Sequence, residues 1–159
     1  MTERVRAVLI TPDHTMLVIR RERPGIPPYH VLPGGHVEPS DTSHEAALIR
    51  EIREEIAGEP TNLAPLHTLT VRGDTERFYT ATITAWSFAD RTGPEFSDPD
   101  PARGTYQLEK IPLTHDDVSR LNLKPDELAD ILRAALTTGR IPQPHTALFA
   151  DLRTREPSQ

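Results

Sequence analysis

Residues 43–58 constrain the fold most, because their pattern predicts a long amphipathic helix that has to lie against an apolar surface. Ser43 is a typical N-cap residue, and the helix is expected to run to about Ala57, with Gly58 at its C-terminal end. The apolar stripe that faces a core is expected to consist of Ile49, Ile52 and Ile56.

Glutamates on this helix share one face beside the apolar stripe. Glu51, Glu54 and Glu55 fall within about a third of the circumference when each residue advances by about 100°. Like charges at this spacing cost about 0.2–0.5 kcal/mol per pair, and Arg50 offsets part of this cost by pairing with Glu54. Two interpretations are open: a solvated acidic face, or a site for a hard cation such as Mg²⁺, which prefers oxygen ligands.

The rest of the chain alternates strand-like and helix-like segments. Strands are expected over residues 4–11, 16–23, 29–32, 64–72, 77–88 and 106–113, the first two as a hairpin. Loops are expected over 24–28 and 89–104, a short helix from 114–117, and a second long helix between Pro125 and Gly139. The predicted fold class is α/β, with helices packed on a mixed sheet.

Length and composition narrow the classes of protein. The 159 residues favour a single domain, placed over residues 1–152, with a flexible C-terminal tail over 153–159 that has little to bury. The absence of cysteine excludes disulfides, thiolate zinc sites and a cysteine nucleophile. The net charge of −6 argues against a nucleic-acid or anionic-membrane partner. With neither a signal-peptide core nor an apolar run of about 18 residues, we expect a soluble cytoplasmic protein.

The segment before the helix favours the cation site. It reads LPGGHVE (residues 32–38) and follows a short expected strand. Its two consecutive glycines allow the backbone to approach a ligand or a metal closely. A loop that folds back against the helix can add carbonyl oxygens to the carboxylates. Two glycines, an acidic residue and then a capped helix form a much more specific pattern than a Gly-Gly turn alone.

This stretch resembles the box of the Nudix hydrolase family, G-x5-E-x7-R-E-U-x-E-E-x-G-U, where U is a bulky aliphatic residue. Gly35 matches the opening glycine, and residues 50–55 (REIREE) match R-E-U-x-E-E without a gap. The box covers about a sixth of the chain, and it is among the more specific short patterns.

The chain departs from the box at two places. The spacing from Gly35 to the arginine is one residue longer than in the family, so Asp41 or Thr42 stands where the family has a glutamate. We place the extra residue in the loop PSDT (residues 39–42), which preserves the register of the helix. Ala57 stands at the later glycine, and Gly58 at the final aliphatic position.

The resemblance implies an α/β/α sandwich that hydrolyses a nucleoside diphosphate linked to another group, with Mg²⁺ or Mn²⁺. It implies that Glu54, Glu55 and the Gly35 carbonyl bind the metal, and that Glu51 is either a ligand or an orienter of the attacking water. It also implies that Arg50 steadies the carboxylates. Many members use a further acidic residue from a later loop as ligand or base, and the candidate here is Glu95, with Asp98 and Asp100 behind it.

Four residues are candidates for substrate binding. Arg21 and His36 are placed to contact phosphate, Tyr29 to stack a base, and Glu38 to act as a supporting carboxylate near the metals. Each has an ordinary alternative: a surface charge for Arg21, a loop position for His36, a core aromatic for Tyr29 and an exposed turn residue for Glu38.

The expected partner is a small-molecule nucleotide, with nucleoside triphosphates, nucleotide sugars, ADP-ribose and others all open as substrates. A nucleotide-binding or sensing module on the same fold, with weak or no catalysis, is the alternative that the irregular spacing near Asp41 suggests. An isomerase-like relative ranks last, because the chain lacks a cysteine for acid–base work. Residues 141–152 carry apolar side chains that either cover the core or pack on a second subunit of a homodimer.

Overall fold

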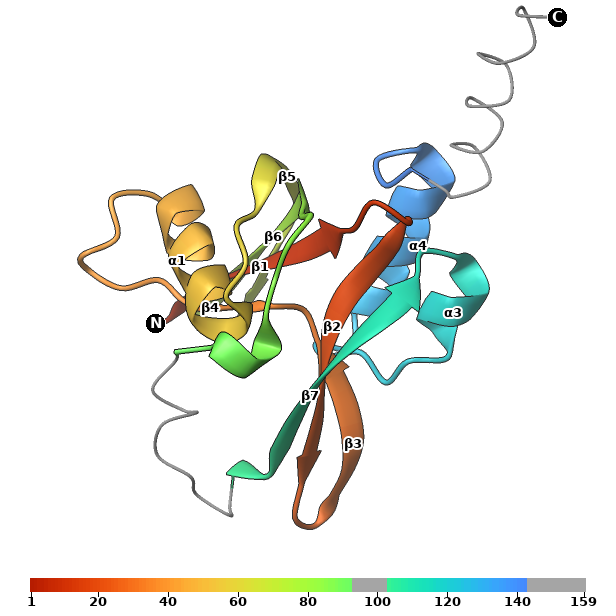
Figure 1. The fold of residues 1–159 in the computed structure, drawn as a ribbon, viewed down its shortest axis with the longest axis horizontal. Coiled ribbons are helices and arrows are strands. Elements are labelled where there is room, and N and C mark those ends of the chain that lie inside the picture. Colours follow the sequence, from red (N-terminus) through yellow and green to blue (C-terminus); the bar gives the residue numbers. More distant parts are fainter. Residues whose placement is uncertain (93–102, 143–159) are drawn as a thin grey trace, which may run out of the picture.

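The computed structural model describes residues 1–92 and 103–142 and contains a seven-stranded mixed sheet. Helix α1 lies on one side of the sheet, and α3 and α4 lie on the other (Figure 1). The strands are β1 (Glu3–Ile10), β2 (Thr15–Arg23), β3 (Ile26–Val31), β4 (Gly34–His36), β5 (Thr61–Val71), β6 (Asp74–Thr82) and β7 (Thr105–Pro112). The helices are α1 (His44–Ile56), α3 (His115–Ser119) and α4 (Leu128–Thr138), with a 3-10 turn η1 at Phe88–Asp90. This arrangement confirms the predicted α/β/α sandwich.

The sheet divides into two parts that share the β1–β2 hairpin. Its order is β3-β2-β1-β6-β5, with β4 also paired to β1 and β7 also paired to β2. Strands β1 and β6 run parallel, whereas the other pairs are antiparallel. Strands β1 and β2 pair at Ile10 and Met16, and beyond this point β1 continues beside β4 while β2 continues beside β3. Strand β4 is thereby brought against α1, the helix that follows it.

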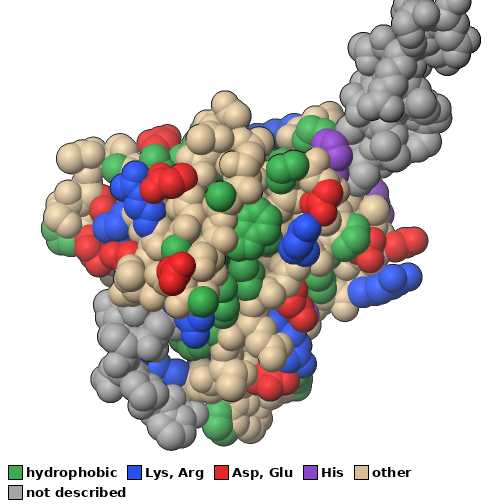
Figure 2. Space-filling model, viewed as in Figure 1, with side chains coloured by type: hydrophobic (Ala, Val, Ile, Leu, Met, Phe, Trp, Pro, Cys, Tyr) green, Lys and Arg blue, Asp and Glu red, His purple; other side chains and the backbone are tan. Residues whose placement is uncertain are grey.

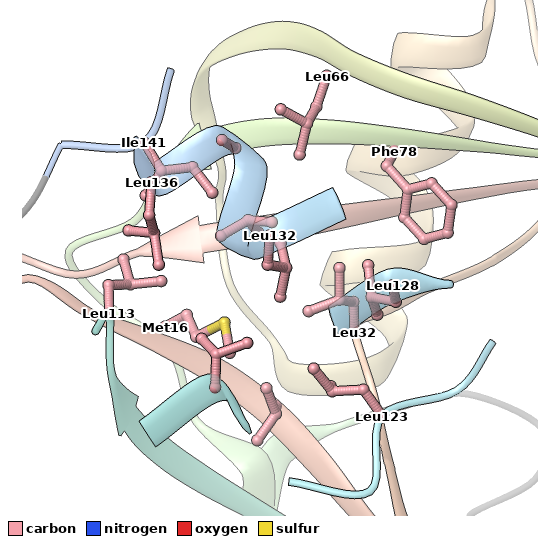
Figure 3. Packing of buried hydrophobic residues seen from close by; sticks show 14 residues of the cluster. Met16, Leu32, Leu66, Phe78, Leu113, Leu123, Leu128, Leu132, Leu136 and Ile141 are labelled. Carbon is pink, nitrogen blue, oxygen red and sulfur yellow. The ribbon is translucent and has the colours of Figure 1, made fainter. Parts of the chain in front are cut away.

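Alternation along the strands supplies two separate cores, because successive side chains point to opposite faces. On β1, Val5, Ala7 and Leu9 pack with α1, whereas Val8 packs with α3 and α4. The core on the α3 and α4 side is shown in Figure 3, where Leu132 and Leu136 of α4 point toward Met16 and Leu113 on the sheet side. The sheet therefore separates the core that carries α1 from the core that carries α4.

All six expected strands are present, but several begin or end elsewhere, and β4 over Gly34–His36 was not predicted as a strand. Residues 24–28 were expected as a loop, but β3 already begins at Ile26, because an edge strand tolerates Pro27 and Pro28. The strand expected over 77–88 ends at Thr82, because the chain then turns toward α1, where the N–H of Ser87 donates to the carbonyl of Ile56 at 2.8 Å.

The helix predictions need three corrections. Helix α4 begins at Leu128, three residues after Pro125, because residues 125–127 form an irregular turn in place of a first helical turn. Helix α1 ends as expected, but the left-handed residue that terminates it is Ala57 (φ 50°) and not Gly58. The buried face of α1 consists of Ala47, Leu48, Ile52, Glu55 and Ile56, so Glu55 lies on the core side while Ile49 is half-buried.

The surface carries charges of both signs. On the face shown in Figure 2, acidic and basic side chains adjoin over the part that carries α1, and hydrophobic side chains form a strip toward the part that carries β7. No helix within the described ranges is long and apolar enough to cross a membrane. The expected tail over 153–159 lies outside the described residues, so the division of the chain at residue 152 stays a prediction.

Candidate active site

Helix α1 is fixed at both ends, which sets the direction of its carboxylates. The Ser43 hydroxyl accepts a hydrogen bond from the N–H of Ala46 at 3.0 Å, as expected of an N-cap. At the other end, the N–H of Ala57 donates to the carbonyl of Arg53 at 3.0 Å. The predicted cap is therefore confirmed, and the register of residues 50–55 along the helix follows from it.

The two glycines of β4 bring backbone against the helix. Gly34 has φ +147°, and a Cβ there would clash with the carbonyl oxygen of Val5 on the neighbouring strand. A Cβ on Gly35 would clash with the carboxylate of Glu51. The N–H of Gly34 donates to Oε1 of Glu55 at 3.0 Å, which provides a partner for a carboxylate that is only 9% exposed. Gly34 therefore permits the close pairing of β4 with β1, and Gly35 leaves space beside β4 for the Glu51 carboxylate.

Arg50 lies at the centre of the charged network. Its Nη1 is 2.9 Å from Oε1 of Glu51 and 3.3 Å from Oε2 of Glu54, the pairing expected from the i,i+4 spacing. Its Nη2 also donates to the carbonyl of His36 at 2.9 Å. One guanidinium thus relieves the repulsion between two glutamates and connects the end of β4 with the helix.

Asp41 holds Arg50 from the other side. Nε and Nη2 of Arg50 donate to the two carboxylate oxygens of Asp41, each at 2.8 Å. The Asp41 side chain is 6% exposed, and hydrogen bonds from Arg50, with a further one from the N–H of Glu38, lower its pKa to about 2. Between the two residues aligned with the family glutamate, Asp41 makes the contact to Arg50, and Thr42 is exposed.

A cleft of about 530 Å³ lies between α1, β4 and the neighbouring strands β2, β3 and β7. Predicted site residues that line it are Arg21, Tyr29, Gly35, His36, Glu38, Glu51, Glu54 and Glu55. Arg50 is not among the lining residues, in keeping with a role behind the carboxylates. The predicted Glu95 lies outside the described residues. The fold therefore brings together, from four different elements, side chains that the sequence separates by as many as 34 positions.

The donor set of this cleft suits a divalent cation. The cleft is lined by the carboxylates of Glu38, Glu51, Glu54 and Glu55, and hard cations such as Mg²⁺ prefer oxygen. As the side chains lie, no three acidic or histidine groups within the described ranges stand at the mutual spacing of metal ligands. The reason is visible in the contacts: Glu51 and Glu54 turn toward Arg50, and Glu55 turns toward Gly34.

Among the cleft residues that the sequence did not identify, one is charged, Arg6, and one is aromatic, Tyr106. Arg6 of β1 lines the cleft, where it pairs with Glu76 at 2.8 Å and donates to the carbonyl of Leu32 at 2.8 Å. Tyr106 of β7 also lines it. No local signal identifies either residue, because both reach the cleft through strand pairings between distant segments.

Burial lowers the pKa of His36, and the charges of Arg4 and Arg6 act in the same direction.

Comparisons with known proteins place this architecture in a family. The NUDIX domain profile matches residues 1–134 of the chain. A search of the curated proteins finds no match. Among solved structures, a MutT from a study of Aliivibrio salmonicida and Vibrio cholerae is similar, with 19% identity, a TM-score of 0.61, and coverage of 85% of this chain and 98% of that one.

Two further solved structures share the fold. A Nudix hydrolase family member from Chromobacterium violaceum has 20% identity and a TM-score of 0.57, over 98% of this chain and 91% of that one. A hydrolase of the NUDIX family from Clostridium perfringens has 18% identity and a TM-score of 0.57, over 85% and 97%. These likenesses support the fold, and the profile match over most of the chain shows that the protein belongs to the NUDIX family, as a Nudix-type pyrophosphohydrolase.

Proposed function

We propose that this chain cleaves the pyrophosphate bond of a nucleoside di- or triphosphate derivative by attack of water, with Mg²⁺ or Mn²⁺ bound at the carboxylates of α1. Nudix enzymes generally act on nucleoside diphosphate derivatives and use divalent metal ions. The observation that carries the proposal is the convergence of Gly35, Glu51, Glu54 and Glu55 on one cleft. A merely solvated acidic face does not account for it, because Glu55 is buried and accepts a hydrogen bond from the N–H of Gly34 in β4.

Within this cleft, Glu54, Glu55 and the Gly35 carbonyl oxygen would hold the ion, and Glu51 would either bind it or orient the attacking water. A divalent ion there supplies positive charge that offsets the phosphate oxygens and increases the acidity of bound water. The family box and the hard-oxygen chemistry of these groups support this assignment.

The surrounding residues act on the positions of these carboxylates. Arg50 contacts Glu51 and Glu54 and is itself held by Asp41, so the helix face keeps its geometry despite its like charges. The N–H of Gly34 orients Glu55. Groups held in this way lose less entropy when they bind a ligand, which favours both metal affinity and the alignment of the reacting atoms.

The remaining cleft residues are proposed to bind substrate. Arg21 and His36 would donate hydrogen bonds to phosphate oxygens, and Tyr29 would contact the base. Glu38 would act as a supporting carboxylate near the metal ions. Glu95 stays our candidate for the further acidic residue or general base. The cytoplasmic location and a homodimer through residues 141–152 also stay predictions.

A hydrolysis screen tests the proposal. Purified protein with Mg²⁺ or Mn²⁺ is assayed against nucleoside triphosphates, nucleotide sugars, ADP-ribose and dinucleotides, beside Glu54→Gln. We expect turnover by the wild type. The kcat of Glu54→Gln is expected to fall by about 100-fold or more, because loss of a direct metal ligand should cost at least as much as loss of an outer-shell partner, which costs about 10-fold to 100-fold. Glu45→Gln is the matched control, because Glu45 is an exposed residue in the first turn of the same helix.

The outcomes separate the hypotheses. Full activity of Glu54→Gln would contradict the assigned roles. An absence of turnover across the panel, with nucleotide binding intact by calorimetry, would favour the alternative of a nucleotide-sensing module. The contact of Asp41 with Arg50 favours the hydrolase, because the irregular spacing near Asp41 leaves the arginine of the box held by a carboxylate.

A further inference from the structure

The side chain of Arg6 on β1 connects two strands with the chain between β3 and β4. It is 16% exposed and makes two contacts of 2.8 Å: Nε donates to Oε2 of Glu76 on β6, and Nη1 donates to the carbonyl of Leu32. Leu32 is completely buried and is the first residue of the LPGG segment (residues 32–35). One guanidinium therefore holds the start of this segment against the sheet.

The LPGG segment is attached to β1 at three successive residues. The carbonyl of Leu32 accepts from the Arg6 side chain, and the carbonyl of Pro33 accepts from the N–H of Ala7 at 3.0 Å. Gly34 then lies opposite Arg6 in the pairing of β1 with β4. Of these attachments, only the one at Leu32 depends on a side chain, so it is the one that a substitution can remove without breaking the backbone pairing.

The other end of the segment contacts the carboxylates of α1. The N–H of Gly34 donates to Oε1 of Glu55 at 3.0 Å, and Gly35 lies so close to Glu51 that a Cβ would clash with its carboxylate. Only Pro33 separates Leu32 from Gly34, and its ring fixes one of the two backbone torsions there. Because the peptide units are planar as well, a displacement at Leu32 is passed on to both glycines.

The contacts of Arg6 favour a role in positioning over a role in binding substrate. Arg6 lines the cleft, so a direct contact with phosphate is the alternative. Its charge is already balanced by Glu76, which is only 17% exposed, and its two contacts are made without any ligand. Without the guanidinium, the Glu76 carboxylate and the Leu32 carbonyl would both lose this partner away from bulk water, and the chain would move to recover one.

We propose that Arg6 is a positioning residue of the metal site: it fixes the LPGG segment, and through it the Gly34–Glu55 hydrogen bond and the Gly35 carbonyl. The inference rests on the proposed function and deepens it by naming a residue outside the box that sets the affinity for the metal. The planar fork of arginine reaches Glu76 and Leu32 at once, whereas lysine carries a single point charge and does not reproduce that geometry.

Binding of Mn²⁺ to the metal-free protein without nucleotide tests this proposal by calorimetry. The Kd of Arg6→Lys is expected to rise by about 10-fold or more, the effect of losing a partner that orients metal ligands. Arg4→Lys is the matched control, because Arg4 lies two residues earlier on the same strand and is not among the residues that line the cleft. Its Kd is expected to equal that of the wild type.

A second pair of variants approaches the same contact from Glu76. Glu76→Ala removes the partner of Arg6 Nε and is expected to weaken Mn²⁺ binding, whereas Glu76→Gln keeps an oxygen that accepts from Nε and is expected to recover most of the affinity. Circular dichroism establishes that each variant is folded before its Kd is compared. A purely structural role of Arg6 would lower the unfolding free energy of these variants but leave the Kd of the folded protein unchanged.

The outcomes separate this inference from the proposed function. Mn²⁺ binding by the wild type with an unchanged Kd in Arg6→Lys would overturn the positioning role alone. An unchanged Kd together with a raised KM for the substrate would assign Arg6 to phosphate binding instead. An absence of Mn²⁺ binding by the wild type would overturn the proposed metal site, and the inference with it.

Discussion

At the scale of single residues, Asp41 connects the loop before α1 with the charged face of the helix. Its carboxylate accepts two hydrogen bonds from Arg50, and Arg50 in turn contacts Glu51 and Glu54. A residue outside the helix therefore positions carboxylates on the helix.

Replacement of Asp41 by asparagine is expected to lower the free energy of unfolding by about 1–2 kcal/mol, because charge-assisted hydrogen bonds to Arg50 are lost. The kcat is expected to fall by about 10-fold to 100-fold, since Glu51 and Glu54 lose their support. Urea unfolding and the hydrolysis assay measure the two effects. Thr42→Ala is the control, and an equal loss in this exposed variant would contradict the placement of Asp41.

The same contact makes a prediction about pH. The pKa of Asp41 is lowered from 3.8 to about 2 in the folded state, so the folded state binds the proton less readily than the unfolded chain. The stabilisation is therefore complete above about pH 4 and is lost as the pH falls toward 2. The difference in unfolding free energy between the wild type and Asp41→Asn should shrink over this range, and a difference that grows on acidification would show that the sign is wrong.

Ala57 adopts a backbone conformation that glycine adopts more readily. It ends α1 with φ 50° and ψ 42°, in the left-handed region where a Cβ is unfavourable. Ala57→Gly is expected to raise the free energy of unfolding by about 0.5–1 kcal/mol, measured by urea unfolding. Ala134→Gly, at an exposed position inside α4, should lower it by a similar amount, and stabilisation by both changes would contradict the conformational explanation.

At the scale of elements, the sequence predicts well those helix and strand ends that are determined by interactions within a short segment. Helix α1 has its N-cap at Ser43 and its end at Ala57 as expected, because capping and periodicity are properties of a short segment. The strands over 4–11, 16–23 and 106–113 were predicted to within a residue at each end for the same reason. The start of β3 and the end of β6 were missed, since pairing on a sheet edge and docking against α1 decide them.

The site could be predicted only in part for a related reason. The residues of the box share one helix and the loop before it, so their proximity follows from local structure. Tyr106 instead lies 85 positions from Arg21, and it reaches the cleft through the pairing of β7 with β2. The burial of Glu55 was also missed, because a helical wheel gives angles between side chains but does not show which face the sheet covers.

The cap of α1 gives a prediction for an element. Ser43→Ala removes the hydroxyl that accepts from the N–H of Ala46, and we expect it to lower the free energy of unfolding by about 1 kcal/mol. Thermal or urea unfolding measures the change. Ser43→Asp should retain most of the stability, because aspartate is an equally good N-cap and favours the positive end of the helix dipole. Equal losses in both variants would show that the hydroxyl contributes in another way.

At the scale of the whole molecule, the sheet separates two cores with different consequences for function. Ile52 packs in the core on the α1 side, next in sequence to Glu51, and Leu132 packs in the core on the α4 side. Both side chains are completely buried. A cavity in the core on the α1 side would let α1 shift relative to β4. A cavity in the core on the α4 side would leave the carboxylates of α1 in their positions.

Ile52→Ala and Leu132→Ala are therefore expected to lower the free energy of unfolding by similar amounts, about 2–5 kcal/mol each, because each removes buried methyl groups and leaves a cavity. Their effects on turnover should differ. At a temperature where both variants remain folded by circular dichroism, kcat should fall in Ile52→Ala and stay near the wild-type value in Leu132→Ala. A misplacement of catalytic groups by about 1 Å can cost 100-fold. An equal fall in both variants would mean that motion is transmitted through the sheet, and that the two cores are not independent.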